Sequence, residues 1–331
     1  MARVQVSAKD VAELAGVSRA AVSRSFTPGA SVSAETRAKV HAAAETLGYQ
    51  VNHLARGLIT SQTGIVALIA AEIGTPYRSA LLAALSETLQ EAGKVGLLIN
   101  TDRSDESVAQ ALRQAIGYRT DAAIVLSGMP DTSLAETCLR NGMRLVVINR
   151  DEERQGSTRI RLDDEAAGRQ AFASLAAAGC RRLALATSLA GTPSLESRCA
   201  GFRAAASEAG VTLRIEAFGA TSYQTGLDIG TRLMTEPDRP DGVFCATDLI
   251  ACGVMDAARR RFRLRVPEDL SVIGFDDIEQ AAWESYDLTT FRQPIREIAQ
   301  VATRCLTAPS DDAPSSVTVP SRMVWRSSVR R

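Results

Sequence analysis

The sequence predicts a small all-α helix-turn-helix head followed by an α/β body of two doubly wound parallel-sheet lobes. Three short helical segments fill residues 1–50 of the 331-residue chain. From Gly64 onward, short apolar runs alternate with amphipathic helical stretches, a pattern typical of parallel sheets covered by helices on both faces. These runs are too numerous for one small sheet, so we expect two lobes that divide near residue 160.

The first two predicted helices of the head are separated by a turn at Gly16. Ser7 and Asp10 have the spacing of a capping box, which places the start of the first helix directly after Ser7. Ser18 has the character of an N-cap for a second helix that runs to about Phe26. Glycine at position 16 suits the left-handed conformation that ends a helix.

A third helix is predicted between Ser33 and Gly48, because apolar residues recur there at helical period. Residues 1–62 carry seven lysines and arginines against four acidic residues, although the whole chain has a formal net charge of zero. A small basic head suits contact with a phosphate backbone. By spacing alone, a three-helix bundle with a solvated charged face fits the same segment.

The composition indicates neither a membrane protein nor a metalloprotein. The longest apolar runs are well short of the ~20 residues that a spanning helix needs. The N-terminus, MARVQVSAKD, lacks the apolar region of a signal peptide, so we expect a cytoplasmic protein. The six cysteines form no CxxC pair and the chain has two histidines, so we expect reduced thiols and no metal site.

The body contains eight predicted strands. They are Ile65–Ala70, Val95–Asn100, Ala122–Leu126, Leu145–Asn149, Arg159–Leu162, Leu183–Ala186, Gly242–Cys245 and Ser271–Phe275. Ligands of open α/β sheets bind at the carboxyl ends of the strands, and polar residues follow several of these runs. The residues in such positions are Asn100, Ser127, Asn149, Arg150, Thr187, Thr247, Asp248 and Asp276.

No catalytic or cofactor motif accompanies these strands. The sequence lacks GxGxxG after a strand, the Walker GxxxxGK[ST] motif and GxSxG. Both histidines, His41 and His53, lie in the basic head, which excludes a Ser/His/Asp set in the body. We therefore expect a binding protein that is not an enzyme and has no cofactor.

The segments DVAELAGVSRAAVSR, VSAETRAKVHAAAETLGY and NHLARGL resemble the DNA-binding head of the LacI/GalR (lactose repressor) family, over about residues 7–58. The resemblance implies that Ser18–Phe26 is a recognition helix in the major groove. It assigns base-edge contacts to Arg19, Ala20 and Arg24, and phosphate contacts to Ser7, Ser18 and Ser23. For both arginines, phosphate contact without base recognition is the alternative.

The next segment, from Asn52 to Leu58, resembles the hinge helix of that family, which folds on the operator. The resemblance implies that Leu58 enters the minor groove and that Ala55 allows two hinges to pack closely. Val51 stands where the family usually has proline, and Ile59 where a basic residue is common. An ordinary linker helix is the alternative for this segment.

In the body, SRCAGFRAAASEAG, FCATDLIACGVMDAARRR, GFDDIEQAAW and LTTFRQP resemble the effector domain of the family, which is itself periplasmic-binding-protein-like. The resemblance implies three crossings between the lobes, near residues 160, 290 and 320. The effector-binding residues that it implies are Tyr77, Arg78, Asn149, Arg150, Arg198, Thr221, Asp248 and Asp276. Thr221 stands where many members have an aromatic residue that stacks on a sugar.

Two of these assignments have alternatives within the sequence. Asp248 and Asp276 each precede or begin a predicted helical stretch, so helix capping is the other role for them. Arg78, Arg150 and Arg198 together favour an anionic effector such as a sugar acid or a phosphorylated sugar. Arginines also bind neutral hydroxyl groups, which leaves a neutral sugar open.

The resemblance implies a sequence-specific DNA-binding transcriptional regulator, a repressor, whose operator affinity is controlled by a small sugar-like effector between the lobes. We expect a helix-turn-helix domain over residues 1–50, a hinge helix and linker over 51–63, and an effector-binding and dimerisation domain over 64–331. Its partners would be a pseudo-palindromic double-stranded DNA operator and a second copy of the chain, with no membrane. A solute-binding sensor without operator specificity is the alternative.

Overall fold

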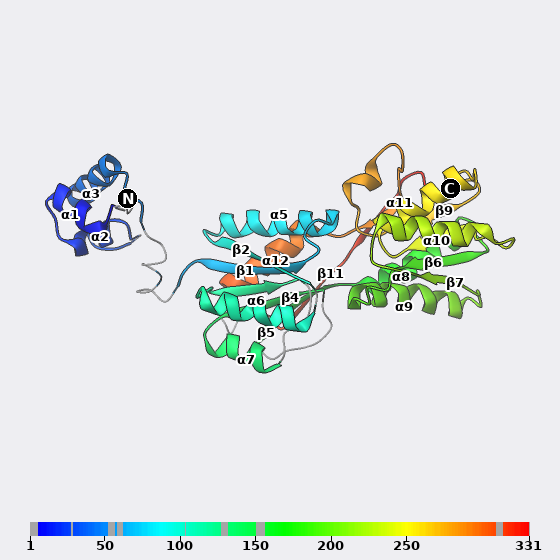
Figure 1. Ribbon diagram of the computed structural model, residues 1–331, viewed down its shortest axis with the longest axis horizontal. Helices are drawn as coiled ribbons and strands as arrows, with labels where there is room; N and C mark the ends of the chain where they lie inside the picture. Colours follow the sequence, from blue (N-terminus) through cyan, green and yellow to red (C-terminus); the bar gives the residue numbers. More distant parts are fainter. Residues whose placement is uncertain are drawn as a thin grey trace. The chain divides into compact units, whose positions relative to one another are not determined.

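The structure is a computed structural model that describes residues 6–27, 29–51, 57, 62–102, 104–126, 132–149, 156–308 and 314–330. The chain divides into two compact units, Met1–Thr63 and Gly64–Arg331, which we call the head and the body. Figure 1 shows helices in the head and helix-covered sheets in the body. In the part of the chain described, no helix is both long enough and apolar enough to pass through a membrane.

The head contains α1 (Ala8–Ala15), α2 (Arg19–Ser25) and α3 (Ala34–Leu47). One buried valine from each helix forms the centre of its small core: Val11, Val22 and Val40. Burial of these side chains on one face of each short helix stabilises helices that would be marginal alone. The three-helix arrangement predicted from the sequence is confirmed.

The predicted helix ends are also confirmed. The Asp10 carboxylate accepts hydrogen bonds from the backbone N–H and the hydroxyl of Ser7, both at 2.8 Å. The side-chain oxygens of Ser18 and Ser33 accept hydrogen bonds from backbone N–H groups in the first turns of α2 and α3. Two helices end at a glycine with positive φ: Gly16 and Gly48.

Lobe 1 of the body has a six-stranded parallel sheet in the order β11-β5-β4-β3-β1-β2. Its strands are β1 (Ile65–Ala71), β2 (Val95–Thr101), β3 (Ala122–Val125), β4 (Arg144–Ile148), β5 (Ser157–Leu162) and β11 (Ser316–Val319). Val66 and Leu68 pack with α5 and α12, whereas Ala67 and Ile69 pack with α6 and α7. These helices are α5 (Pro76–Glu91), α6 (Asp105–Gly117), α7 (Thr132–Arg140) and α12 (Ile295–Thr307).

Lobe 2 has a four-stranded parallel sheet in the order β7-β6-β8-β9. Its strands are β6 (Leu183–Thr187), β7 (Arg214–Ala217), β8 (Gly242–Cys245) and β9 (Ser271–Ile273). Helices α8 and α9 cover one face of the sheet, and α10 and α11 cover the other. Their bounds are α8 (Asp164–Ala177), α9 (Pro193–Glu208), α10 (Tyr223–Thr235) and α11 (Asp248–Asp256).

Two shorter helices complete lobe 2. A π-helical turn, η1 (Ala257–Arg261), continues α11. A 3-10 helix, η2 (Glu279–Ala282), follows β9.

Three segments connect the lobes. The chain passes from β5 to α8 between Leu162 and Asp164, from β10 (Thr290–Arg292) to α12, and from β11 to β12 (Arg322–Val324). Strands β10 and β12 pair antiparallel, so the second and third connections lie side by side. The crossings expected near residues 160, 290 and 320 are confirmed.

All eight strands predicted from the sequence are present, with bounds that differ by no more than two residues. The prediction omits β7, β10, β11 and β12, which are only three or four residues long. Their side chains include Arg, Glu, Ser and Thr, so none shows the apolar run by which the others are recognised.

Candidate functional site

The exposed face of α2 carries short polar and basic side chains, whereas its other face holds the buried Val22. The residues of this exposed face are Ser18, Arg19, Ala20, Ser23 and Arg24. The hydroxyl of Ser18 accepts the N–H of Ala21 at 3.2 Å, which fixes the start of the helix. Small residues between two arginines leave this face open to close approach by another surface.

Arg19 and Arg24 form no ion pair or side-chain hydrogen bond with any residue of the described chain. The other basic residues described in the head are engaged. Lys9 and Lys39 pair with glutamates one helical turn away, at 3.6 and 2.8 Å. Arg37 donates to the backbone carbonyl oxygens of Ser25, the last residue of α2, and of Ala30. The two free guanidinium groups of the described head therefore lie on one helix face.

The remaining residues assigned to DNA are Ser7 and three residues of the hinge segment. Ser7 is exposed, and its hydroxyl donates to Asp10. The assigned hinge residues Asn52, Ala55 and Leu58 lie outside the described residues, as does Ile59. Their roles stay predictions.

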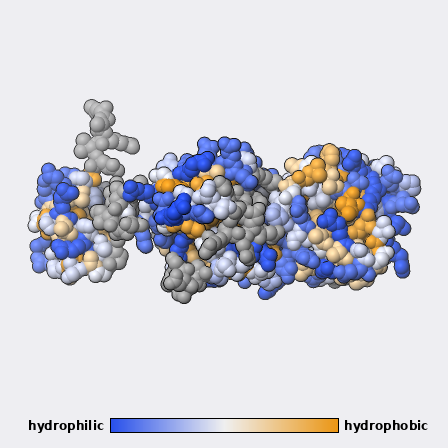
Figure 2. Space-filling model, turned by 90° about the horizontal axis from the view of Figure 1, so that it is seen from below, coloured by the Kyte–Doolittle hydropathy of each residue, from blue (hydrophilic) through white to orange (hydrophobic). Residues whose placement is uncertain are grey.

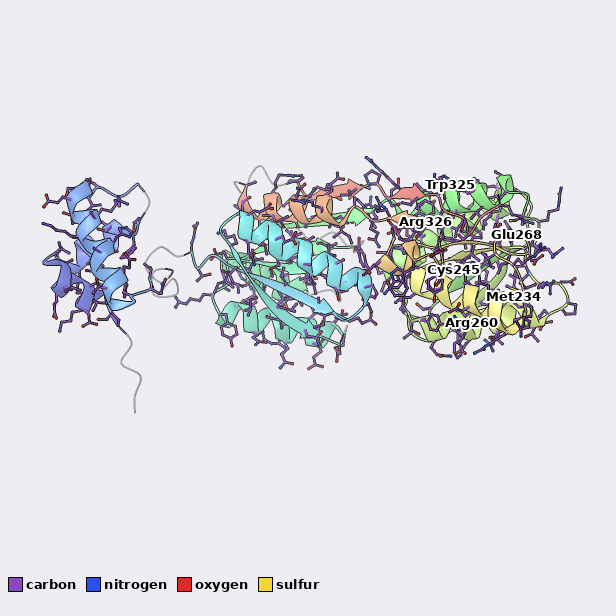
Figure 3. All side chains as sticks on the ribbon, turned by 90° about the horizontal axis from the view of Figure 1, so that it is seen from above. Met234, Cys245, Arg260, Glu268, Trp325 and Arg326 are labelled. Atoms are coloured by element: carbon purple, nitrogen blue, oxygen red, sulfur yellow. The ribbon has the colours of Figure 1, made fainter. Side chains whose placement is uncertain are left out.

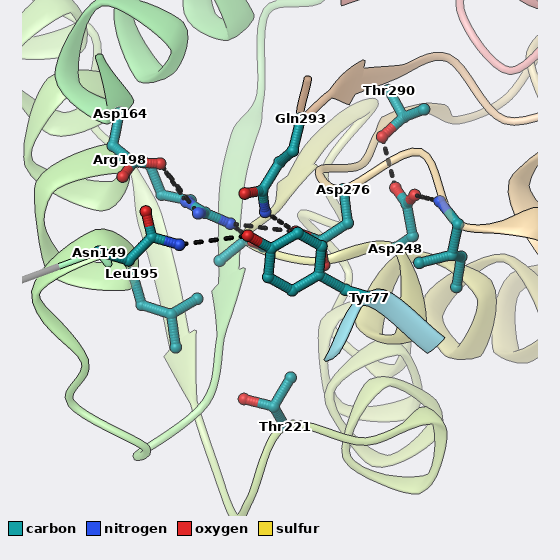
Figure 4. Close-up of polar contacts among 12 residues, drawn as sticks. Tyr77, Asn149, Asp164, Leu195, Arg198, Thr221, Asp248, Asp276, Thr290 and Gln293 are labelled. Carbon is teal, nitrogen blue, oxygen red and sulfur yellow. Dashed lines mark hydrogen bonds and ion pairs between the residues drawn. The ribbon is translucent and has the colours of Figure 1, made fainter. Parts of the chain in front are cut away.

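A cavity of about 830 Å³, its open mouth included, lies between the two lobes of the body (Figure 4). Both lobes turn the carboxyl ends of parallel strands toward it, as expected for open α/β sheets. Its lining residues are Glu72, Thr75, Pro76, Tyr77, Arg78, Leu126, Asn149, Thr192, Ser194, Leu195, Arg198, Thr221, Thr247, Leu249, Asp276, Ile278 and Gln293. Six of the eight effector residues assigned from the sequence are among them; Arg150 lies outside the described residues.

Arg198 of α9 occupies the lobe 2 wall with only 3% of its side chain exposed. Its Nε and Nη2 atoms both contact Asp164 Oδ1, at 3.1 and 2.9 Å. Its Nη1 donates to the carbonyl oxygen of Ala246 at 2.8 Å. The guanidinium carbon lies 3.5 Å from the centre of the Phe275 ring, a cation–π contact. The charge of Arg198 is therefore balanced within the protein, mainly by Asp164.

Asp276 lies beside Arg198 on the same wall. Its Oδ1 accepts a hydrogen bond from Gln293 Nε2 at 2.6 Å and lies 3.8 Å from Arg198 Nη1. Burial raises the pKa of Asp276 above the ordinary range, and the positive charge of Arg198 opposes that rise. The backbone of Asp276 has φ of 121°, a costly conformation for a non-glycine residue that is found mostly at functional sites.

The lobe 1 wall is formed by Tyr77, Arg78 and Asn149. Asn149 Nδ2 donates to the Tyr77 hydroxyl at 3.3 Å, and Asn149 itself has a positive φ of 58°. Burial raises the pKa of Tyr77 to about 12, so its hydroxyl stays protonated. Arg78 Nη1 donates to the carbonyl oxygen of Leu126 at 2.8 Å. This wall thus presents neutral polar groups, the Arg78 guanidinium and the Glu72 carboxylate.

Three polar atoms of the cavity lining are buried and have no hydrogen-bond partner: Asn149 Oδ1, Thr247 Oγ1 and Gln293 Oε1. A buried polar group without a partner costs about 1–3 kcal/mol. All three atoms can accept a hydrogen bond, and the Thr247 hydroxyl can also donate one. A solute rich in hydroxyl groups would satisfy them.

Thr221 gives the lobe 2 wall a polar surface at the position where many family members have an aromatic residue. Its hydroxyl lies 2.7 Å from the hydroxyl of Ser188. Among the lining residues that the structure describes, Tyr77 is the one aromatic. Lobe 2 therefore offers hydroxyl groups and the aliphatic Leu195 and Leu249 in place of a flat ring.

The structure does not place Asp248 on the cavity wall, although the resemblance assigns it to the effector. Asp248 is fully buried and does not line the cavity. Its Oδ2 accepts the N–H of Ile278 at 2.9 Å, and its Oδ1 accepts the hydroxyl of Thr290 at 2.5 Å (Figure 4). Asp248 therefore holds the loop after β9 and the strand β10, while its neighbours along the chain face the cavity.

The capping alternative for Asp276 is also wrong. No α-helix begins after it in this described segment; the 3-10 helix η2 begins at Glu279. Gln293 and Asp164 are site residues that no sequence pattern predicts. Gln293 follows the three-residue strand β10, which carries no strand signal, and Asp164 looks like one more acidic residue at a helix start.

Two family models match the chain. A model described as bacterial regulatory proteins, lacI family, matches residues 7–52, and one described as periplasmic binding protein-like domain matches residues 172–329. The first covers α1–α3 with the exposed face of α2, and the second covers most of lobe 2 with Arg198 and Asp276.

Whole-length relatives agree with these matches. The chain is 31% identical to the HTH-type transcriptional regulator GalR of Escherichia coli K12, over 92% of this chain and 90% of the relative. It is 31% identical to the ribose operon repressor of the same organism, over 89% and 90%. It is 28% identical to catabolite control protein A of Priestia megaterium, over 99% and 100%.

The fold also matches a solved structure, that of the lac repressor dimer bound to operator and the anti-inducer ONPF. The TM-score is 0.88 at 26% identity, over 99% of this chain and 100% of that chain.

A helix-turn-helix head with a free basic helix face, joined to a two-lobed body with a polar cavity, defines a ligand-responsive DNA-binding regulator. The chain belongs to the LacI family of bacterial regulatory proteins. It is a transcriptional regulator with a DNA-binding head and a ligand-binding body.

Proposed function

We propose that the chain represses transcription by binding a pseudo-palindromic operator as a homodimer, and that a neutral sugar bound between the lobes controls its operator affinity. The observation that carries the ligand class is the set of buried, unpartnered polar atoms on the cavity wall: Asn149 Oδ1, Thr247 Oγ1 and Gln293 Oε1. Asn149 and Thr247 lie at the carboxyl ends of parallel strands, where open α/β sheets bind small molecules. Sugar hydroxyl groups donate and accept, which suits these atoms.

A neutral ligand fits the charges of the cavity better than a sugar acid or a phosphorylated sugar. Arg198 is balanced by the buried Asp164, and its Nη1 already donates to a backbone carbonyl. Arg78 donates to the Leu126 carbonyl. Asp276 and Glu72 add negative charge to the lining, which disfavours an anion. Each carboxylate can instead accept hydrogen bonds from hydroxyl groups.

The DNA-binding part of the proposal is supported by the free guanidinium groups of Arg19 and Arg24 beside the small Ala20. Arginine makes bidentate contacts with guanine, and alanine can contact a thymine methyl group. Residues 1–50 would bind the operator, and residues 51–63 would form the hinge, with Asn52, Ala55 and Leu58 at the minor groove. A solute sensor without operator specificity is the alternative, but it leaves this unpaired basic face unexplained.

A homodimer fits the surface of the body. Figure 2 shows apolar residues among the more numerous hydrophilic ones on that surface. Val95 and Leu98 of the edge strand β2 are 64% and 47% exposed. The lac repressor structure that this chain resembles is itself a dimer on its operator. We place the regulator in the cytoplasm, with its DNA, and assign it no catalytic role, in line with relatives that are all named as regulators.

Calorimetry with a panel of neutral sugars and sugar acids tests the ligand class. The panel would include D-ribose, D-galactose, D-glucose, D-gluconate and D-ribose 5-phosphate. We expect at least one neutral sugar to bind and to change the affinity for a genomic promoter fragment. Asp276→Asn should weaken that binding, whereas Asp269→Asn, at an exposed ion pair with Arg265, should not. Binding of the acids alone would contradict the proposal.

A further inference from the structure

Each of the three connections between the lobes is attached to lobe 2 by a charged or polar side chain. At the first connection, Asp164 pairs with Arg198 at 2.9 Å. At the second, Gln293 donates to Asp276. At the third, Arg326 follows β12 where the chain returns to lobe 2 (Figure 3). The first two contacts include residues of the cavity wall, Arg198 and Asp276, and the third involves Asp277, the residue next to Asp276.

Asp277 is the residue on which the second and third connections meet. Its Oδ2 accepts Nε of Arg292, the last residue of β10, at 2.5 Å. Its Oδ1 accepts Nη2 of Arg326, just after β12, at 2.7 Å. The side chain of Asp277 is 5% exposed, and that of Arg326 is 13% exposed. One carboxylate therefore fixes both antiparallel strands to the loop after β9.

The same loop faces the cavity one residue earlier. Asp276 lines the cavity and Asp277 does not, although the two share a peptide unit. Both have positive φ, 121° and 55°, which is uncommon for residues other than glycine. The N–H of Asp276 donates to the Phe291 carbonyl of β10, and the Phe275 and Phe291 rings stack at 5.5 Å.

We propose that Asp277 is a positioning residue that couples the state of the cavity to the lobe arrangement. A ligand that hydrogen-bonds to Asp276 changes the position of the 275–277 loop, which the Asp276 N–H and the Phe275 ring attach to β10. The Asp277 carboxylate accepts hydrogen bonds from Arg292 and Arg326, and we call these two contacts the clamp. Because the clamp joins the loop to both strands, β10 and β12 follow that change. Removing the clamp leaves the cavity intact but lets the connections move on their own. The proposal rests on the proposed function only for the identity of the ligand.

Interlobe distances measured by double electron–electron resonance test this coupling without any ligand. Spin labels would be placed at two exposed positions of the full chain, Glu87→Cys on α5 and Ser207→Cys on α9. The described native cysteines are all buried, which limits labelling elsewhere. We expect a broader distance distribution in Asp277→Asn than in the parent. Asp269→Asn, which breaks a comparable ion pair away from the connections, should leave the distribution unchanged.

Arg292→Gln provides a second test of the same contact if Asp277→Asn does not fold. The Arg292 side chain is 60% exposed, so its replacement affects the core little, yet it removes one arm of the clamp. It should also broaden the distribution. Identical distributions in the parent, Asp277→Asn and Arg292→Gln would overturn the proposal, because an ion pair that only adds stability does not alter the distance between the lobes.

A second measurement uses the sugar of the panel that binds the parent. We expect that sugar to shift the mean interlobe distance in the parent and not in the clamp variants, while its calorimetric Kd changes by less than about threefold. A full shift in Asp277→Asn would overturn the proposal. If no sugar of the panel binds the parent, the proposed function fails, and the ligand-free distributions still decide the role of Asp277.

Discussion

Arg198 and Asp164 form a buried ion pair, with side chains 3% and 5% exposed and Nη2 2.9 Å from Oδ1. Asp164 begins α8 directly after the first crossing between the lobes, and Arg198 projects from α9. The pair thus fixes a lobe connection and the cavity wall together. A buried pair of this kind adds little net stability over apolar residues, but the loss of one partner is costly.

Asp164→Ala should therefore destabilise the body strongly, because it leaves the Arg198 charge buried without its partner. We expect a loss of about 3–5 kcal/mol in the free energy of unfolding, measured with urea. The matched control is Glu208→Ala, which breaks the Arg169–Glu208 pair at the same distance of 2.9 Å but with 39% and 66% exposure. Its cost should stay under about 1 kcal/mol. Equal losses would contradict this account of the buried pair.

The close packing of α8 on α9 leads to a second prediction, which concerns Gly168. A Cβ atom on Gly168 would lie 2.0 Å from the Arg198 carbonyl oxygen and 2.8 Å from the Phe202 nitrogen. Both are backbone atoms, so Gly168→Ala must push the helices apart. We expect a loss of about 1–3 kcal/mol in the free energy of unfolding and weaker sugar binding, since Arg198 moves with α9.

Gly117→Ala is the control for this substitution. Gly117 also lies in a helix, α6, and a Cβ there meets nothing within 4 Å. Alanine has a higher helix propensity by up to about 1 kcal/mol, so this variant should be as stable as the parent or more stable. A Gly168→Ala protein with parent-like unfolding and sugar affinity would show that α9 can shift freely.

Most of the fold could be predicted from the sequence because most of the predicted strands are buried on both faces, and the exposed edge strand β2 is apolar as well. Such strands are continuous apolar runs, as in Gly242–Cys245, and are recognisable without tertiary information. The strands β10 and β12 could not be found in this way. They are three residues long, and their pairing is fixed by contacts between residues far apart in sequence, such as Phe291 with Met323.

The cavity residues divide along similar lines. Residues that directly follow predicted strands, such as Asn149 and Asp276, could be placed because parallel strands end at one edge of a sheet. The same rule also selected Asp248, whose side chain does not line the cavity. Successive side chains after a strand point in different directions, so Thr247 faces the cavity while Asp248 turns toward Ile278. Spacing alone cannot distinguish the two.

Asp248 should make the stability of the body fall as the pH rises. Burial, with a contribution from the nearby Asp276 charge, raises the pKa of Asp248 in the folded state. Between the ordinary carboxyl pKa of about 4 and this raised value, the native state binds more protons than the unfolded state. The free energy of unfolding therefore decreases with pH across this window.

Asp248→Asn removes that dependence. An amide oxygen can still accept the Ile278 N–H, and the amide nitrogen can donate to Thr290 Oγ1. Urea unfolding from about pH 5 to about pH 8 should give a flatter profile for the variant, with the variant gaining on the parent as the pH rises. Asp269→Asn is the control: hydrogen bonds from Arg265 lower the pKa of Asp269, so this carboxylate stays ionised across the range and its removal should leave the slope of the profile unchanged. An unchanged profile in Asp248→Asn would show that the buried carboxyl is already ionised across this range.

Arg19 and Arg37 should contribute to DNA binding in different ways, although both are arginines of the head. Arg19 is exposed and free on α2, whereas Arg37 donates to the carbonyl oxygens of Ser25 and Ala30. With a duplex selected from a random pool by the parent protein, Arg19→Ala should lose about 1–3 kcal/mol of binding free energy and relax one base position. If Arg19 contacts only phosphate, affinity falls uniformly across sequences and the salt slope drops by about one. Arg37→Ala should instead lower the melting temperature of the head and leave its base preferences intact. Unchanged affinity and base preference in Arg19→Ala would remove this residue from the DNA interface.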